Sequence, residues 1–244
     1  MRDDGNLMVG CAGWSLASKD AAFFPGDGTH LERFSRVLSC VEINSSFYRP
    51  HQEKTYARWA RSVPGAFRFS VKMPRSITHE HRLQRCEVPL RAFLAEISAL
   101  EEKLAVILIQ LPPSLALDVS VAGDFFSHLR ECTDVAVACE PRHASWFTSA
   151  AARILDKANV STVAAHPSPV GKFDPHTDTG LLYIRLHGAP QIYYSAYDDT
   201  FLARIESPMR RAHAQGKPAW CIFDNTARGA AIPNALTLQK LLKS

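Results

Sequence analysis

The sequence predicts an α/β fold, namely a single (β/α)8 barrel of the TIM type that covers residues 1–244. Two observations favour this fold. Eight short apolar runs come at nearly even spacing, and segments of helical periodicity lie between them. Alternating strands and helices over about 250 residues are typical of such a barrel. The alternative, a doubly wound open sheet, is disfavoured because no GxGxxG motif follows the first run.

The apolar runs have the length and composition of strands that are buried on both faces, as parallel strands are. In chain order they cover residues 8–12, 40–44, 67–72, 104–111, 135–140, 160–165, 181–187 and 219–223. The proline-rich positions 112–113 and 167–169 directly follow two of these runs, so we interpret them as loops rather than as linkers. We therefore expect one domain.

Helical segments separate the strands. The clearest covers residues 89–103, in which Leu90, Phe93, Leu94, Ile97 and Leu100 recur at helical spacing. The other expected helices cover residues 30–38, 55–61, 121–132, 149–158, 199–215 and 234–242.

Composition and charge limit the class of protein. With 46% hydrophobic and 21% charged residues, the chain is not disordered, collagen-like or a disulfide miniprotein. No apolar stretch approaches the roughly 20 residues of a membrane span, and residues 1–7 lack the apolar core of a signal peptide. Its six cysteines form no close pair, which favours buried thiols in a reducing cytoplasm over disulfides or a zinc site. They are Cys11, Cys40, Cys86, Cys132, Cys139 and Cys221.

Positive charge is concentrated between residues 49 and 91. This stretch holds ten Lys or Arg residues against three Glu, whereas the formal net charge of the whole chain is +4. Such a cluster can attract an anionic small molecule or nucleic acid. An ordinary solvated helix face is the alternative interpretation.

Polar residues near the strand ends predict where a ligand binds. Side chains alternate in direction along a strand, and the active sites of these barrels lie at the carboxyl ends of the strands. Burying so many polar groups without partners would cost a few kcal/mol each, so they must pair with one another or bind a ligand. The alternation directs inward Glu42, Asn44, Arg68, Ser70, Lys72, Gln110, Glu140, Arg142, Tyr183, Arg185 and His187. It does not choose between Asp224 and Asn225 at the last strand end.

The same strand ends carry a family resemblance. The segments, in order, are GW at 13–14, EINSSFY at 42–48, FRFSVK at 67–72, ITH at 77–79, QLPP at 110–113, EPRH at 140–143, SW at 145–146, RLHG at 185–188, YYS at 193–195 and FDN at 223–225. In this combination the sequence resembles the DUF72 family, also called the YecE-like family. The resemblance implies a TIM-type barrel and no established activity. Asp224 departs from the family pattern, which more often has Asn there, and it adds a carboxylate.

Glu140 is the principal candidate for acid–base catalysis, provided that its surroundings tune its pKa. A fixed ion pair with Arg142 or Arg185 is the alternative role. We expect His187, which precedes Gly188, to assist in proton transfer or to bind a metal. Glu42 completes the expected catalytic set.

Lys72 is expected to bind an anion; a salt bridge to Glu42 and a role as base or amine nucleophile are the alternatives. The expected substrate-binding residues are Asn44, Tyr48, Lys72, His79, Gln110, Arg142, Arg185, Tyr194, Asp224 and Asn225. A divalent metal on His79, His187, Glu140 and Asp224 would suit phosphodiester hydrolysis. No HxH or HExxH spacing supports it, so the metal is left open.

Together these features predict an enzyme that binds a phosphate-bearing or other anionic substrate at the barrel mouth. Hydrolase or lyase chemistry on a phosphodiester or a sugar phosphate is the expected reaction class. A nucleic-acid-binding protein without catalysis and a small-molecule-binding protein are the alternatives.

Overall fold

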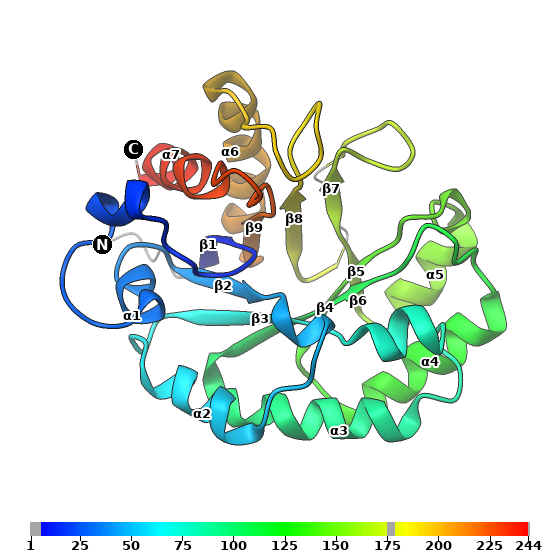
Figure 1. Ribbon diagram of the computed structural model, residues 1–244. Helices are drawn as coiled ribbons and strands as arrows, with labels where there is room; N and C mark the ends of the chain where they lie inside the picture. Colours follow the sequence, from blue (N-terminus) through cyan, green and yellow to red (C-terminus); the bar gives the residue numbers. More distant parts are fainter. Residues whose placement is uncertain (1–5, 175–178, 244) are drawn as a thin grey trace.

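The strands form one parallel sheet that curves into a ring with helices outside it (Figure 1). The computed structural model describes residues 6–174 and 179–243. Around the ring the order is β6-β5-β4-β3-β2-β1-β9-β8-β7. The segments are β1 (Leu7–Cys11), β2 (Cys40–Ile43), β3 (Arg68–Lys72), β4 (Leu104–Gln110), β5 (Ala136–Glu140), β6 (Val160–Thr162), β7 (Ala164–His166), β8 (Leu182–Leu186) and β9 (Ala219–Phe223).

The strand predicted at 160–165 is divided into β6 and β7 by one residue, Val163. Its first half pairs with β5, where Val160 lies opposite Val137, and its second half pairs with β8, where Ala164 lies opposite Ile184. This segment therefore joins the two edges of the sheet and completes the ring. The predicted TIM-type barrel is confirmed, with its sixth strand shared between two neighbours.

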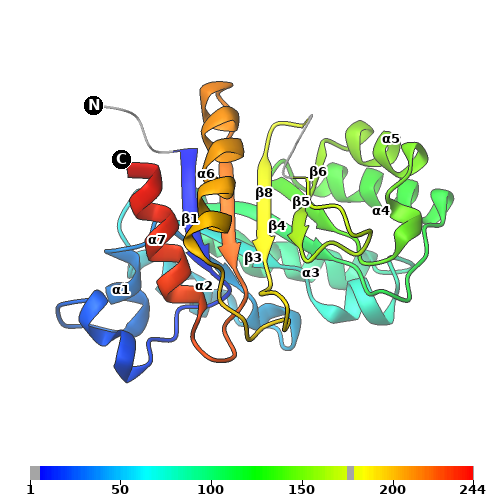
Figure 2. The same ribbon diagram turned by 90° about the horizontal axis from the view of Figure 1, so that it is seen from above.

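Seven α-helices are described around the ring (Figures 1 and 2). They are α1 (His30–Ser35), α2 (Glu53–Arg61), α3 (Glu87–Ile97), α4 (Val119–Cys132), α5 (Ser149–Lys157), α6 (Asp199–Ala214) and α7 (Ala231–Lys243). Local chemistry fixes where several begin. Thr29 and Glu32 form a reciprocal capping box at α1, and the side chains of Asp118 and Asp198 accept backbone hydrogen bonds at the first turns of α4 and α6.

The helix expected at 89–103 is interrupted. After α3 the chain tightens into the 3-10 helix η5 (Ser98–Lys103), and Glu101 adopts a φ of 53°, which no α-helix contains. Leu100 remains fully buried, so the apolar periodicity reflects burial across both pieces. Between β7 and β8, residues 167–174 and 179–181 contain no helix.

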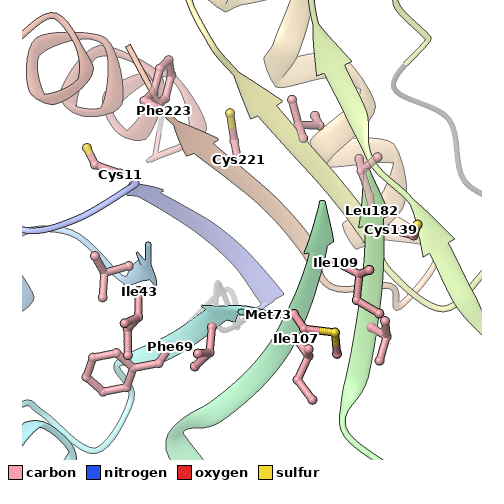
Figure 3. Close-up of a cluster of buried hydrophobic side chains, with 14 of the residues drawn as sticks. Cys11, Ile43, Phe69, Met73, Ile107, Ile109, Cys139, Leu182, Cys221 and Phe223 are labelled. Carbon is pink, nitrogen blue, oxygen red and sulfur yellow. The ribbon is translucent and has the colours of Figure 1, made fainter. Parts of the chain in front are cut away.

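Two apolar layers follow the alternation along the strands. Outward side chains pack against the helices, and Figure 3 shows part of this layer, including Ile43, Phe69 and Ile107. Inward side chains such as Leu108 and Trp220 form a second cluster that fills the barrel. The polar inward residues lie beyond this apolar cluster and are concentrated at the carboxyl ends of the strands.

Short helical turns follow three strands at this end of the barrel and shape its mouth. They are η3 (Ser45–Phe47) after β2, η4 (Ser76–Glu80) after β3 and η6 (Ala144–Trp146) after β5. The turn η4 is π-helical, a conformation that is frequent at functional sites.

All six cysteines are free, and five of them are buried. Among the helices of the described residues, none has the length and apolar character that crossing a membrane requires. The expected cytoplasmic location stays a prediction.

Candidate functional site

Arg185 on β8 is the centre of the polar layer at the mouth. Its guanidinium is fully buried and binds Glu42 on β2 with two nitrogens, Nε at 3.0 Å from Oε2 and Nη2 at 2.7 Å from Oε1. Nη1 lies 2.5 Å from Glu140 Oε2, and Nη2 lies 3.2 Å from Asp224 Oδ2. One guanidinium thus connects three carboxylates that come from different parts of the ring. Burial alone would lower the pKa of Arg185, but these carboxylates outweigh it and hold the pKa well above its ordinary value.

Glu42 lies below the opening and is fully buried. Besides Arg185, it accepts from the hydroxyl of Tyr183, which lies 2.9 Å from Oε2 and 2.8 Å from Ser70 Oγ. Burial and the charge of Glu42 raise the pKa of Tyr183 well above its ordinary value, so this phenol stays protonated. Glu42 forms no salt bridge with Lys72, because its oxygens are already bound by Arg185 and Tyr183. The expected catalytic role of Glu42 stays a prediction.

His187 lies between two carboxylates. Its Nδ1 is 2.9 Å from Asp224 Oδ2, and its Nε2 is 3.0 Å from Glu140 Oε1. Arg142 Nη2 lies 2.7 Å from the same Nε2 and also forms an ion pair with Glu140 Oε1. With a hydrogen on Nδ1 alone, the ring donates to Asp224 and accepts from Arg142; with hydrogens on both nitrogens, it donates to both carboxylates. Nε2 can therefore exchange a proton while Nδ1 keeps its partner.

The charges around Glu140 keep it ionised. Burial alone would raise the pKa of Glu140, but Arg185, His187 and Arg142 outweigh it and hold the pKa well below its ordinary value. For Asp224, burial is likewise outweighed by Arg185 and His187, and its pKa is lowered. A general acid needs a raised pKa, which neither carboxylate has. Both are therefore suited to accept hydrogen bonds and so to orient a neighbouring proton donor. Gln110 adds a hydrogen bond of 3.3 Å to Glu140 Oε1.

Glu140→Gln is expected to flatten the loss of stability in acid. The folded-state pKa values of Glu140 and Asp224 lie below the ordinary values, so their stabilisation is complete above about pH 5 and is lost as the pH falls through the folded-state values. The wild-type free energy of unfolding should fall over this acid range, and the variant should lose less. Urea unfolding at a series of acid pH values measures the slope.

Glu96→Gln is the matched control for that slope. Burial raises the pKa of Glu96, so this carboxyl contributes a pH dependence of opposite sign. Removing it should leave the acid loss intact or make it steeper. An acid slope in Glu140→Gln equal to that of the wild type would contradict the assignment.

Lys72 differs from the other charged groups at the mouth. It ends β3 and is 6% exposed, and its Nζ lies 4.1 Å from the centroid of the Phe47 ring. Within the described residues its ammonium forms no hydrogen bond and no ion pair. Burial first, and the charge of Arg185 second, lower the pKa of Lys72 to about 8. His79 lies on the other side of Phe47, with ring centroids 4.9 Å apart.

The structure separates the residues of the expected metal set. His187, Glu140 and Asp224 are joined by hydrogen bonds, whereas His79 binds Thr78 Oγ1 at 2.8 Å and packs on Phe47. Residues 6–174 and 179–243 contain no group of three or more His, Cys, Asp or Glu arranged to hold a metal ion.

The remaining expected binding residues take three kinds of position. Asn44 occupies the N-cap position of η3 without a side-chain capping bond, and its buried Oδ1 has no hydrogen-bond partner among the residues that the structure describes. Tyr48 lies at the rim and is 72% exposed. Tyr194 is also exposed, and Arg228 Cζ lies over its ring, 5.3 Å from the ring centroid. Asn225 turns away from the network: its Nδ2 donates to the backbone oxygen of Ser195 at 3.0 Å. Asp224 is therefore the inward residue of the pair.

Two further residues contribute to the mouth. Asn234 on α7 binds both backbone groups of Tyr197, with Oδ1 3.0 Å from its nitrogen and Nδ2 2.8 Å from its oxygen. Tyr193 has a φ of 69°, and its ring lies 6.0 Å from that of His187. A non-glycine residue in this region is strained, which is common at ligand sites. Tyr193 lies within the YYS segment of the family resemblance, whereas no local signal points to Asn234.

A pocket of about 540 Å³ opens between the loops that follow β1 and β9. Its lining includes Lys19, the buried Asp20 and Arg228. The charges of Asp20 and Asp224 both act on the Cys11 thiol, which places this pocket beside the polar layer. It provides space for a small molecule next to the mouth.

Residues 8–244 match the family model described as "Protein of unknown function DUF72". The chain belongs to the DUF72 family. The resemblance inferred from the strand ends is thereby confirmed. Two curated DUF72-like relatives are UPF0759 proteins. YecE of Escherichia coli K12 is 27% identical over 156 residues, which cover 62% of this chain and 57% of YecE. YunF of Bacillus subtilis strain 168 is 22% identical over 97% of this chain and 94% of YunF. The chain thus matches little more than half the length of YecE.

Solved DUF72 structures share the fold. A DUF72 family protein from Thermotoga maritima has a TM-score of 0.83 at 23% identity and covers 98% of this chain and 99% of its own. One from Enterococcus faecalis has a TM-score of 0.82 at 22% identity, with coverages of 98% and 96%. The 3-keto-D-glucoside 4-epimerase YcjR of E. coli has a TM-score of 0.52 at 11% identity and covers 98% of this chain and 99% of its own. At these identities the likeness concerns the fold alone.

Proposed function

We propose that this DUF72 protein is an enzyme that binds a small anionic substrate at the barrel mouth and transfers protons through His187, with Glu140 as the fixed carboxylate beside it. The observation that carries the proposal is the ammonium of Lys72, which is almost fully buried and has no carboxylate partner among the described residues. A buried cation is costly unless a counter-charge compensates it. An anionic group of a substrate would supply that charge.

The other cations of the mouth support the same conclusion. Arg185 is occupied by three carboxylates and is closed to a ligand. Arg142 shares Glu140 with other groups, and its side chain remains 17% exposed. Lys72 and Arg142 are therefore cations of the described polar layer that can contact a substrate. Arg suits bidentate contact with a phosphate or a carboxylate.

A small anion is favoured over a nucleic acid because several basic residues of 49–91 are bound within the chain. Arg75 pairs with Glu80, Arg82 donates to the backbone oxygen of Ser114, and Arg68 donates to that of Gly65. The charge of Lys72 lies inside the mouth, apart from these surface residues. It is therefore suited to bind a molecule small enough to enter the barrel. Nucleic-acid binding remains an outcome that the experiment below can detect.

For the chemistry, His187 Nε2 is the group that gains or loses a proton, and Asp224 holds Nδ1 so that the ring keeps its orientation. Glu140 stabilises the charged ring, as a fixed carboxylate does in acid–base catalysis. Lys72 and Arg142 would stabilise negative charge that develops on the substrate. These roles suit hydrolysis or lyase cleavage of a phosphodiester or a sugar phosphate.

Calorimetric titration with inorganic phosphate at low salt tests the proposed site. The wild type is expected to bind, and Lys72→Met to bind about tenfold more weakly or worse, which corresponds to about 1.4 kcal/mol. Affinity should also fall as the pH rises past about 8, because Lys72 then loses its charge. Arg211→Met, which removes an exposed charge on α6, is the matched control and should bind as the wild type does.

Two results would contradict the proposal. One is the absence of phosphate binding at low salt; the other is equal affinity in Lys72→Met and the wild type. Tight binding of an oligonucleotide with a steep salt dependence, unchanged in Lys72→Met, would instead favour the nucleic-acid alternative.

A further inference from the structure

Two buried lysines of this chain have opposite surroundings. Lys103, which is 9% exposed, donates from Nζ to the backbone oxygens of Ala60 at 2.5 Å and Val63 at 2.9 Å. Lys72 is buried to a similar degree, yet in the described part of the chain its Nζ forms no hydrogen bond and no ion pair and lies 4.1 Å from the centroid of the Phe47 ring. Lys103 is thus held by the protein, whereas the nitrogen of Lys72 is left available at the mouth.

The charges around Lys72 favour a reactive amine. Burial and the Arg185 guanidinium disfavour the ammonium, while the carboxylates of Glu42, Asp224 and Glu140 favour it, and the balance lowers the pKa to about 8. Burial first, and the charge of Lys72 second, lower the pKa of His79 on the neighbouring turn η4. A much larger fraction of this amine than of an ordinary lysine is therefore neutral and nucleophilic near pH 8.

We propose that Lys72 captures the carbonyl carbon of an anionic aldehyde or ketone as an imine, with Arg142 holding the anionic group. This inference rests on the proposed function, since it uses the same mouth and names the substrate class. It favours the lyase alternative, because an imine withdraws electrons from the neighbouring carbon–carbon or carbon–hydrogen bond.

The capture is a condensation without any redox change. The lone pair of the neutral Nζ forms a bond to the carbonyl carbon, and the π pair moves to oxygen, which takes up a proton. The nitrogen then gives up a proton, the hydroxyl takes up a second proton and leaves as water, and the carbon–nitrogen double bond forms as a protonated imine. Loss of the second nitrogen proton gives the neutral imine. One amine and one carbonyl thus yield one imine and one water.

The surroundings suit each participant. His187 Nε2, which can gain or lose a proton, belongs to the same polar layer as Arg142 and Glu140. Protonation of the imine gives a flat cation above the face of Phe47, which an aromatic ring stabilises as it does an ammonium.

Reductive trapping tests the inference. The full chain is incubated with glyoxylate, an anionic aldehyde, and sodium cyanoborohydride near pH 8, and labelled lysines are mapped by peptide mass spectrometry. Capture leaves a carboxymethyl group on Nζ. We expect Lys72 to be labelled about tenfold faster than the exposed Lys54, because its amine is less protonated. Lys103, buried and held by two carbonyls, is the matched control and should stay unlabelled.

Acetaldehyde, which carries no charge, separates the roles of the two cations. Arg142→Met should slow glyoxylate labelling of Lys72 about tenfold and leave acetaldehyde labelling nearly unchanged. Lys72→Arg keeps the positive charge but cannot form a stable imine, so it should lose the label.

The two proposals fail differently. If phosphate binds as predicted but glyoxylate labels Lys72 no faster than Lys54, the imine is overturned and the anion site stands. If Lys72 is labelled selectively but phosphate does not bind and Arg142→Met has no effect, the anionic substrate class is overturned.

Discussion

Arg185→Met is expected to lower the free energy of unfolding by about 3–5 kcal/mol, because it leaves buried carboxylates without their counter-charge. Glu42, Glu140 and Asp224 all bind the same guanidinium, and methionine would fill its volume without replacing any of these bonds. Urea unfolding at neutral pH measures the change. The loss should shrink as the pH falls and the abandoned carboxylates become protonated.

Arg142→Met is the matched control for this loss. Arg142 contacts the same Glu140, but its side chain is partly exposed and Glu140 keeps Arg185 as its partner. Its removal should therefore cost about 1 kcal/mol. If Arg185→Met costs no more than Arg142→Met, Arg185 does not have the central role that its contacts indicate.

Lys72→Met is expected to raise the free energy of unfolding at pH 7 by about 3 kcal/mol, because the pKa of Lys72 is lowered from 10.5 to about 8 in the folded protein. The folded protein disfavours the ammonium relative to the unfolded chain. This cost is fully present below about pH 8 and disappears as the pH rises to the ordinary value of 10.5. The advantage of the variant should therefore vanish in alkaline solution, which thermal or urea unfolding at a series of pH values will show.

Lys103→Met is the matched control, because Lys103 is buried to a similar degree but its substitution should lower the free energy of unfolding rather than raise it. Its Nζ binds two backbone oxygens, so the substitution leaves the carbonyls of Ala60 and Val63 without a partner. We expect it to destabilise the protein by about 1–3 kcal/mol. Destabilisation by Lys72→Met comparable to that by Lys103→Met would show that Lys72 is a structural lysine.

The barrel and its inward-facing residues were predictable because the strand period is two and apolar residues mark one phase of it. Val41 and Ile43 face the helices, so Glu42 must face the interior, and the same reasoning holds on β3 and β8. The division of β6 from β7 was not predictable, because it depends on how the ring closes at Val163 rather than on local sequence.

Which inward residues meet was also beyond the sequence. Alternation places Arg185 and Lys72 inward alike, yet the first is enclosed by carboxylates and the second is not. That difference depends on the stagger of strands across the ring, which no local pattern records. The same limit left Asp224 and Asn225 undecided and gave no signal for the contacts of Asn234.

The Arg185 cluster has a consequence for how the chain reaches its fold. Arg185 on β8 and Glu42 on β2 are 143 residues apart in the sequence, so their contact can form only when both strands are in place in the barrel. A partly assembled barrel that ends before β8 would enclose Glu42 and Glu140 with no guanidinium between them, and their mutual repulsion would oppose compaction. Fragments that end before β8 should therefore remain expanded. We expect β8 and β9 to join the barrel before water leaves its interior. The charges that stabilise the finished mouth thus also set the order of its assembly.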